Sequence, residues 1–430
     1  MKKGFTLIEL LAVILILGII ALIAIPTVNN ILKEAREGAF RTSSDNIMKS
    51  MEEACQTSLI RGDNPVLSYI FTDGKSSSKL EVKGTMPNDG YVFLDRECSV
   101  TNFYLTDQNN TYTNGEDVRK DYMLKEPIDN NTSIFKSLYS SYYNNLLSIN
   151  TVNHLNIPEG AIEIKDASVS EAGKIKSWLV QNGSNYDLYI GSEGKIYANY
   201  NSAYLFSGSS ATSITFDNFY TDFVNNMNSL FSNGKFASLN VANFNVSNVK
   251  NMNRIFYQCT NITSLELSNW NTGNVENMSS IFQYCNNLVS VDISNWDTKK
   301  AKSIHAFFYN TPIEIIDISK WDLRNIDVTN IYSFSDIFGG DAAKQVPSTI
   351  YLPNIDIDKN VTLNDTFRFR NGLKYIHCTN KNNIEIFSQD LLTRSSSDVG
   401  YIITTQQVIN TISEDVKTLL ANKNWTLQVG

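Results

Sequence analysis

A sequence period of 25 or 26 residues governs more of this 430-residue chain than any local pattern. Apolar triplets of common spacing recur after residue 205, and their central residues begin with Ile214, Leu239, Leu265, Val291 and Ile316. The alternating apolar side chains predict a short strand in each copy, then a turn and a helical or 3₁₀ segment. A copy of this length cannot bury its apolar face alone, so neighbouring copies must stack. The sequence therefore predicts a solenoid over 205–380.

Aromatic residues recur with the same period. One set ends the predicted helical or 3₁₀ segment of each copy: Phe231, Phe256, Phe282 and Phe308. A second set follows the predicted strand: Phe219, Phe244, Trp270, Trp296 and Trp321. Because equivalent positions of stacked repeats lie above one another, we expect two aromatic columns inside the array.

The two clearest copies are residues 259–282 and 285–308, which read CTNITSLELSNWNTGNVENMSSIF and CNNLVSVDISNWDTKKAKSIHAFF. This pattern is similar to the BspA-type leucine-rich repeat of bacterial surface proteins. The resemblance implies an exported protein with an adhesive or recognition role, directed at an unspecified protein or glycan. We expect residues 151–204 to cap the array at its start and residues 381–430 to cap its end.

The chain begins with MKKGFTLIELLAVILILGIIALIAIPTV. The apolar stretch from Phe5 onward is about 24 residues long, enough for a helix to cross a bilayer core of ~30 Å. Lys2 and Lys3 precede it, which favours a cytoplasmic N-terminus and export of the rest. The stretch is too long for a cleaved secretory signal peptide, so we expect it to be retained.

Glu9 is an acidic residue inside this apolar helix. Deep in lipid a carboxylate costs roughly 2–3 kcal/mol, so such residues usually have a partner and a function. Cleavage after Gly4 would create a new amino group on Phe5, one helical turn from Glu9. An amine and a carboxylate attract strongly in a low-dielectric bundle, within one chain or between neighbouring chains.

The string KKGFTLIELLAVILILGIIALIAIP resembles the class III signal of type IV pilins and pseudopilins. The resemblance implies cleavage between Gly4 and Phe5 by prepilin peptidase, and N-methylation of Phe5. It also implies that Glu9 pairs with the N-terminus of an adjacent pilin subunit during assembly. Gly18 and Pro26 match positions where pilin helices bend or unwind. The protein would then lie in the bacterial membrane before assembly and in an extracellular filament afterwards.

Residues 1–150 fit this resemblance as a leader (1–4), an assembly helix (5–61) and a globular head (62–150). Apolar residues continue at helical spacing past Pro26 until Gly62 stops the helix. Three short alternating segments predict antiparallel strands: 80–84, 90–95 and 100–105. Residues 133–149 predict an amphipathic helix rich in Tyr. The expected fold class is α+β: a long N-terminal pilin helix with a small antiparallel sheet, followed by a leucine-rich-repeat solenoid.

The five cysteines do not form a dense disulfide framework. Cys55 and Cys98 could form one bridge in an oxidising environment, or could both be buried free thiols. Cys259 and Cys285 occupy equivalent positions in successive repeats, and we expect them to be stacked free thiols.

Two columns of polar residues follow the repeat period. One holds Asn240, Glu266, Asp292 and Asp317, and the other holds Asn271, Asp297 and Asp322. Stacked strands bring such residues ~5 Å apart, so three carboxylates could bind Ca²⁺ or a cationic ligand. The alternative is a solvated acidic face. The net charge of -8 and the lack of a basic stripe argue against a nucleic-acid partner.

Catalytic motifs of the common hydrolase, nucleotide-binding and metalloprotease types do not occur in the sequence, so we expect no enzyme. The leading hypothesis is a minor, adhesin-bearing subunit of a type IV pilus-like filament. One alternative is a pseudopilin of a type II secretion or competence system. Another is an unassembled, membrane-anchored leucine-rich-repeat surface protein.

Overall fold

The computed structural model describes most of the chain. It describes residues 7–430 apart from 73, 79, 81–84, 108, 115–118, 120–121, 127–131, 170–172, 341–346, 359, 362, 364 and 368–371, and it leaves out the side chains of 9, 21–24, 26 and 27. The predicted processing residues Gly4 and Phe5 therefore lie outside the described residues. So do the side chains of Glu9 and Pro26.

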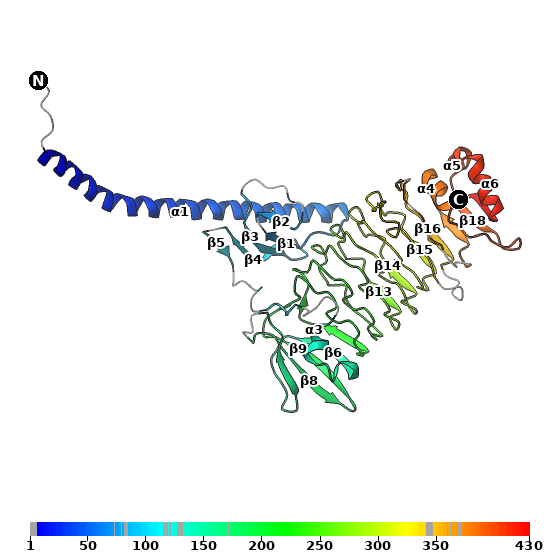
Figure 1. The fold of residues 1–430 in the computed structure, drawn as a ribbon, viewed down its shortest axis with the longest axis horizontal. Helices are drawn as coiled ribbons and strands as arrows, with labels where there is room; N and C mark the ends of the chain where they lie inside the picture. The colour runs from blue at the N-terminus through cyan, green and yellow to red at the C-terminus, as the bar shows by residue number, and fades with distance from the viewer. Residues whose placement is uncertain are drawn as a thin grey trace, which may run out of the picture. The chain divides into compact units, whose positions relative to one another are not determined.

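The protein has a mixed α+β fold with a long N-terminal helix and several sheets (Figure 1). It divides into two compact units. The first comprises Met1–Thr57 and Tyr69–Glu116, and the second comprises Ser58–Ser68 and Asp117–Gly430. The segment 117–150, which we expected in the globular head, belongs to the second unit.

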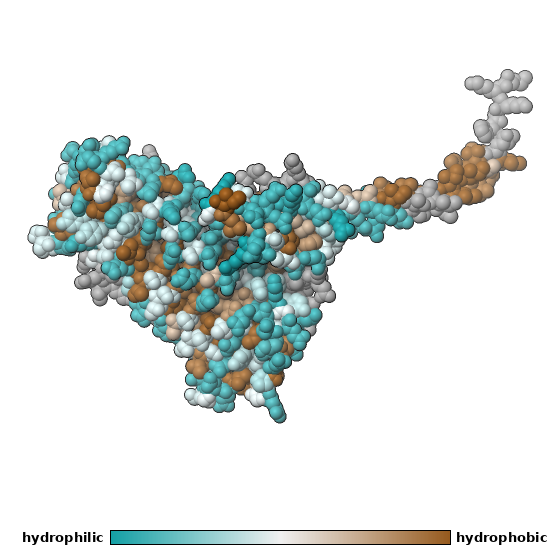
Figure 2. Space-filling model, turned by 180° about the vertical axis from the view of Figure 1, so that it is seen from behind, coloured by the Kyte–Doolittle hydropathy of each residue, from teal (hydrophilic) through white to brown (hydrophobic). Residues whose placement is uncertain are grey.

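The first helix, α1, runs from Leu7 to Arg61 over 55 residues, as the sequence predicts. It ends where Gly62 adopts a φ of 75°, a conformation that favours glycine. The apolar side chains of its first half are exposed (Figure 2). Among the residues that the structure describes, no helix is long and apolar enough to cross a membrane. The predicted membrane segment, 5–28, includes residues outside that description.

The second half of α1 buries a stripe that includes Phe40, Ile47, Met51 and Cys55. The antiparallel sheet of the first unit has the strand order β2-β1-β3-β4-β5. Its strands are β1 (Ser68–Thr72), β2 (Lys75–Ser76), β3 (Asp89–Leu94), β4 (Val100–Thr106) and β5 (Thr111–Thr113). The strands predicted at 90–95 and 100–105 are confirmed, and most of 80–84 lies outside the described residues.

A disulfide joins α1 to the turn between β3 and β4. It links Cys55 with Cys98, whose Cα atoms are 5.6 Å apart. Beside it, the amide of Gln56 donates to the carbonyl oxygen of Glu97 at 2.8 Å. The carboxylate of Glu52 accepts the backbone N–H of Val100 at 3.1 Å. Covalent and polar contacts therefore both hold the helix to this sheet.

The predicted helix over 133–149 is wrong. Only α3 (Ile134–Leu138) is α-helical, a 3₁₀ turn η1 (Tyr143–Asn145) follows, and Leu146–Val152 forms strand β6. The Ser, Tyr and Asn residues of this segment are weak helix formers, so tertiary pairing decides its conformation. Strand β6 buries Ile149 completely and lies between two parallel neighbours.

The sheet that contains β6 opens the second unit, with the order β11-β6-β9-β8-β7. Its other strands are β7 (Ile162–Asp166), β8 (Lys176–Asn182), β9 (Asn185–Gly191) and β11 (Ser213–Phe216). A further parallel pair joins β10 (Ile196–Tyr197) to β12 (Phe219–Tyr220). Because β11 is the strand of the first repeat, this sheet extends directly into the repeats.

Short parallel strands follow at the repeat spacing, except in the copy centred on Leu239, where the predicted strand does not form (Figure 1). Strand β13 (Ser264–Glu266) pairs with β14 (Ser290–Asp292). A five-stranded parallel sheet then contains β15 (Ile315–Asp317), β16 (Thr349–Tyr351), β17 (Tyr375–His377), β18 (Gly400–Thr404) and β19 (Trp425–Val429). Helices α4 (Lys381–Ser388), α5 (Gln406–Thr411) and α6 (Glu414–Asn422) lie between the last strands in sequence.

The segments expected to be helical or 3₁₀ in each repeat are consecutive turns instead. The backbone N–H groups of Met227 and Ser229 donate to the carbonyl oxygens of Asn251 and Asn253 in the next repeat, both at 2.8 Å. A helix needs these N–H groups for its own i→i−4 bonds, so bonding between repeats excludes it. The turns also require positive φ, for example 55° at Ser229.

The core between repeats contains a column of parallel phenylalanine rings. Neighbouring ring centroids are 5.5 to 6.3 Å apart along Phe206, Phe231, Phe256, Phe282, Phe308, Phe338 and Phe367. Trp270 and Trp296 stack beside it with centroids 6.1 Å apart. Stacked aromatic pairs add about 0.5–1.5 kcal/mol each beyond area burial, so the column binds each repeat to the next.

Cys259 and Cys285 are buried free thiols, as is Cys378. Burial raises the pKa of the Cys259 thiol to about 12. The thiols of Cys259 and Cys285 donate to the carbonyl oxygens of Phe231 and Phe256. In the following repeat Thr311 occupies the equivalent place, and its hydroxyl donates to the carbonyl oxygen of Phe282.

Candidate ligand-binding cleft

A row of polar turns passes through the second predicted polar column, Asn271, Asp297 and Asp322. The side-chain oxygen of each accepts the backbone N–H of the residue two positions later, at 3.2, 3.0 and 3.2 Å. Asn and Asp favour such turns because their short side chains can reach this N–H. Turn formation therefore accounts for the residue type at all three positions.

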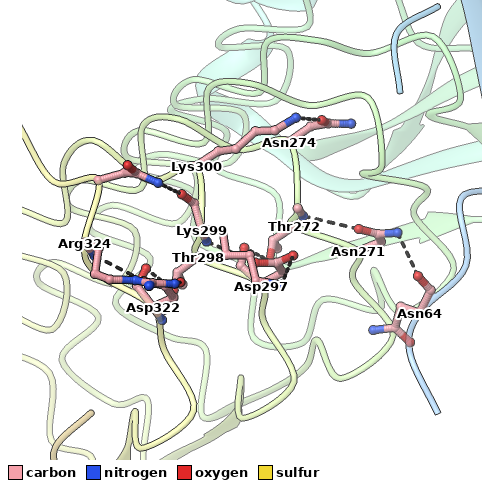
Figure 3. A network of polar contacts seen from close by, with 12 residues as sticks. Asn64, Asn271, Thr272, Asn274, Asp297, Thr298, Lys299, Lys300, Asp322 and Arg324 are labelled. Atoms are coloured by element: carbon pink, nitrogen blue, oxygen red, sulfur yellow. Dashed lines mark hydrogen bonds and ion pairs between the residues drawn. The ribbon is translucent and has the colours of Figure 1, made fainter. Parts of the chain in front are cut away.

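Two threonines connect these turns. The hydroxyl of Thr272 donates to the carbonyl oxygen of Asp297, and that of Thr298 donates to the carbonyl oxygen of Asp322, both at 3.0 Å (Figure 3). Both threonines are buried. Because a buried carbonyl without a donor costs about 1–3 kcal/mol, these hydroxyls stabilise the stacking of neighbouring turns.

The segment Ser58–Ser68, part of the second unit, lies against the same row of turns. The amide nitrogen of Asn271 donates to the carbonyl oxygen of Asn64 at 2.8 Å (Figure 3). Asn64 in turn donates its own amide to the carbonyl oxygen of Ser268 at 3.0 Å. At the end of the segment, the hydroxyl of Ser68 accepts the amide of Asn248 at 2.7 Å. These bonds hold the segment in place as one wall of a cleft.

The cleft has a volume of about 560 Å³. This volume falls within the roughly 300–1,000 Å³ typical of small-molecule sites. The lining residues are Ser58, Arg61, Gly62, Asp63, Asn64, Asn271, Thr272, Ser294, Asn295, Trp296, Asp297, Thr298, Lys299, Lys320, Asp322 and Ile355. Most of them carry hydroxyl, amide or charged groups, so the cleft suits a polar ligand.

Each of the two repeat carboxylates of the cleft lies beside a cation of the chain itself. The guanidinium of Arg324 donates two hydrogen bonds to the carboxylate of Asp322, from Nε to Oδ1 at 2.9 Å and from Nη2 to Oδ2 at 2.6 Å. The Arg324 bonds hold the pKa of Asp322 below its usual range. Asp297 lies 3.8 Å from the ammonium of Lys299. The cleft therefore offers less free negative charge than its composition suggests.

Two cations on the cleft wall have no ion-pair partner among the described residues. Arg61 is exposed at the end of α1. Lys320 is also exposed, and its ammonium donates to the amide oxygen of Asn295 at 3.5 Å. Asp63 is also exposed, and it is the one lining carboxylate for which no ion pair within 4 Å occurs among the described residues.

The first predicted polar column lies on the outward strand face, away from the cleft lining. Glu266 and Asp292 are in register on β13 and β14. Asp317 is in register with Tyr351 instead, because β14 and β15 belong to different sheets. Asp292 accepts the N–H of Ser294 at 3.1 Å, and Asp317 forms the same kind of turn. A cavity of about 80 Å³ is lined by residues of β14 and β15.

The structure shows no metal cluster at either column. No group of three or more His, Cys, Asp or Glu side chains that could hold a metal ion occurs among the described residues. The Ca²⁺ site suggested by the sequence stays a prediction without a coordinating group. Asp292, Asp297, Asp317 and Asp322 each accept a backbone N–H in a turn, and Asp297 and Asp322 also lie beside Lys299 and Arg324.

Of the predicted assembly residues, only Gly18 is described in full, because the side chains of Glu9 and Pro26 lie outside the description. Gly18 lies within continuous helix and has no neighbouring atoms within 4 Å of an added Cβ. Sequence reasoning missed the cleft wall formed by Arg61 and Asn64. It also missed Thr272 and Thr298, although their 26-residue spacing, equal to the repeat step, is a signal that could have found them.

Comparisons with known protein families match two parts of the chain. A family described as the prokaryotic N-terminal methylation motif matches residues 1–25. This match supports a prepilin-like signal at the N-terminus. A family described as Mycoplasma protein of unknown function, DUF285, matches residues 200–321 and again 225–346. The two matches are displaced by 25 residues, which is the repeat step. No solved structure matches the chain.

Proposed function

We propose that the protein is a minor subunit of a type IV pilus-like filament, which assembles through α1 and displays the repeats as an adhesin. The observation that carries the proposal is the N-terminal methylation motif at residues 1–25, which continues into α1. The motif indicates a pilin-like or pseudopilin-like subunit. It is consistent with prepilin peptidase and other pilin subunits as partners.

The exposed first half of α1 supports assembly. Leu7, Ile8 and Ile14 are 75%, 78% and 60% exposed in the isolated chain. A contiguous apolar surface of this kind needs lipid or other protein to cover it. In the proposed cycle, lipid covers it before assembly and neighbouring stems cover it in the filament. Glu9 would then find its partner in the N-terminal amine of an adjacent subunit.

We infer that the repeats form a solenoid of the leucine-rich-repeat type. Three observations support this architecture: the parallel strands, the hydrogen bonds between equivalent turns, and the column of phenylalanine rings. Such arrays present extended surfaces that bind other molecules. The proposed role is binding of an extracellular protein or glycan, without enzymatic activity.

The bulk of the second unit favours sparse incorporation. The repeats and their caps account for most of the 430 residues, so a filament made only of this subunit would be crowded. A pseudopilin of a secretion or competence system shares the methylation motif and is the second candidate. A neighbouring retraction ATPase gene would favour the pilus, and a neighbouring secretin or competence-channel gene would favour the pseudopilus.

The decisive measurement is mass spectrometry of filaments sheared from the cell surface. We expect a mature chain that begins with N-methylated Phe5. A mature chain that begins at Met1, or that lacks the apolar helix, would overturn the proposal. The Glu9→Ala variant should be lost from sheared filaments, whereas Glu34→Ala, at an exposed acid later in α1, should not. Absence of the natural protein from sheared filaments, with retention of the whole chain in the membrane, would favour an unassembled membrane-anchored protein.

A further inference from the structure

We propose that the cleft between Ser58–Asn64 and the repeat turns binds a sugar that carries a carboxylate. This inference deepens the adhesin part of the proposed function, and its biological role rests on that function. The binding itself is a property of the cleft and can be measured apart from filament assembly.

Two cations without an ion-pair partner among the described residues line the cleft. Arg61 and Lys320 are far apart in the sequence but both line the cleft, and neither forms an ion pair with a described residue. A guanidinium can hold a carboxylate with two parallel hydrogen bonds, and an ammonium adds a second charge-assisted bond. An anionic group is therefore the charged partner that the cleft lacks.

The cleft also contains neutral and acidic groups that can bind hydroxyl groups. Asn295 is exposed, and Asp63 carries an exposed carboxylate. Amide and carboxylate oxygens accept hydrogen bonds from hydroxyl groups, and the Asn295 amide nitrogen can also donate one. A ligand with one carboxylate and several hydroxyls satisfies both kinds of group. A simple anion would leave the carboxylate of Asp63 facing a like charge.

Hydrogen bonds already hold several side chains in the walls of the cleft. Asn64 and Asn271 are held by bonds to each other and to the backbone. Asp297 and Asp322 are held by their turns, and Asp322 is held also by Arg324. Groups held in this way need little reorganisation when a ligand binds, which lowers the entropic cost. Because Asp297 and Asp322 already lie beside Lys299 and Arg324, the cleft attracts the cationic ligand that the sequence suggests less strongly.

The test uses the full-length protein purified in detergent, with two matched sugars as probes. Glucuronic acid differs from glucose by the carboxylate alone, and isothermal titration or saturation-transfer NMR measures both. We expect glucuronic acid to bind at least about tenfold more tightly, because a charge-assisted contact contributes on this scale. N-acetylneuraminic acid, a larger acidic sugar, should bind as well. Equal or absent binding of glucuronic acid and glucose would overturn the proposal.

Variants locate the site. Lys320→Gln and Arg61→Gln should each weaken glucuronic acid binding by at least about tenfold, without a change in melting temperature. Lys374→Gln removes a cation that lies over Tyr375 outside the cleft, and should leave binding unchanged. Unchanged binding by the Lys320→Gln, Arg61→Gln double variant would disprove the assignment. So would equal competition by triglutamate, which would indicate an acidic peptide site.

Failure of this inference and failure of the proposed function are distinguishable. Recovery of N-methylated Phe5 from filaments reports assembly and does not depend on the cleft. Filaments that contain the protein but bind no acidic sugar would refute the ligand and leave the pilin assignment intact. A protein that binds glucuronic acid but never enters filaments would refute the assembly role and leave the cleft intact.

Discussion

The thiol of Cys285 donates to the carbonyl oxygen of Phe256 at 3.0 Å. One repeat later, the hydroxyl of Thr311 occupies the same place and donates to the carbonyl oxygen of Phe282 at 2.5 Å. Both side chains are buried against the phenylalanine column. The position therefore accepts either a thiol or a hydroxyl as a small hydrogen-bond donor.

This relationship predicts that Cys285→Thr retains the stability of the second unit. Cys285→Val has nearly the same shape as Thr but no donor, so we expect it to be about 1 kcal/mol less stable than the threonine variant. All five tryptophans lie in the second unit, so their fluorescence during urea unfolding reports on it. Equal midpoints for the two variants would show that the donor contributes nothing.

The tryptophans themselves offer a matched comparison. The indole Nε1 of Trp296 donates to the carbonyl oxygen of Leu267 at 3.2 Å. The Nε1 of Trp321 is buried without a hydrogen-bond partner in the described part of the chain. Replacing Trp296 by Phe removes a bond, whereas replacing Trp321 removes an unsatisfied donor. We expect Trp296→Phe to lower the free energy of unfolding by about 1 kcal/mol more than Trp321→Phe.

The cost of positive φ predicts a stabilising substitution. Gln258 has a φ of 56°, and the equivalent residue two repeats earlier is Gly208, with a φ of 66°. A left-handed conformation costs a non-glycine residue roughly 1–2 kcal/mol, and glycine loses roughly 0.4–1 kcal/mol through its freer unfolded state. Gln258→Gly should therefore raise the free energy of unfolding by about 0.5–1 kcal/mol.

Gln283→Gly is the control for this substitution, because Gln283 does not have positive φ. Glycine there only adds unfolded-state entropy, so we expect a loss of roughly 0.5–1 kcal/mol. Denaturation curves followed by tryptophan fluorescence measure both variants. Destabilisation of both to the same extent would contradict the argument from φ.

The Asp322–Arg324 pair predicts a dependence of stability on acid. Its hydrogen bonds lower the pKa of Asp322 in the folded protein below the ordinary value of 3.8. A carboxyl group with a lowered folded pKa stabilises the fold above its unfolded pKa, and this contribution is lost as pH falls through the folded pKa. We expect the melting temperature to fall below about pH 4.

Asp322→Asn removes the titrating group and serves as the comparison. Its melting temperature should be lower than that of the natural protein at pH 7, and the difference should shrink as pH falls below about 4. Calorimetric melts at several pH values measure the difference. A constant difference from pH 7 to pH 3 would show that the pair does not control the acid response.

The sequence predicts best those features that repeat. The spacing of Leu265, Val291 and Ile316 places three short parallel strands correctly, because each must bury the same apolar face. Helix α1 follows similarly from its apolar spacing and from Gly62. The disulfide between Cys55 and Cys98 could not be predicted from the sequence, since spacing alone does not favour a bridge over two buried free thiols.

The features that the sequence does not reveal depend on contacts between distant residues. Asn64 and Asn271 are separated by 207 residues, so the cleft wall that they form has no local signal. The apolar spacing of 133–149 predicts a helix, but the end of this segment forms strand β6 because two neighbouring strands pair with it. The turns after each strand contain apolar residues at spacings compatible with a helix, but their N–H groups bond to the next repeat.

Bonding between equivalent turns limits how the length of this array can change in evolution. Each turn donates alternate N–H groups to the turn that follows, so a gain or loss of a few residues within one turn would mismatch its donors and acceptors with those of both neighbouring turns. Duplication or deletion of a whole copy keeps the pattern. Natural variants should therefore differ in reach by complete copies, with smaller insertions confined to the loops between turns and strands.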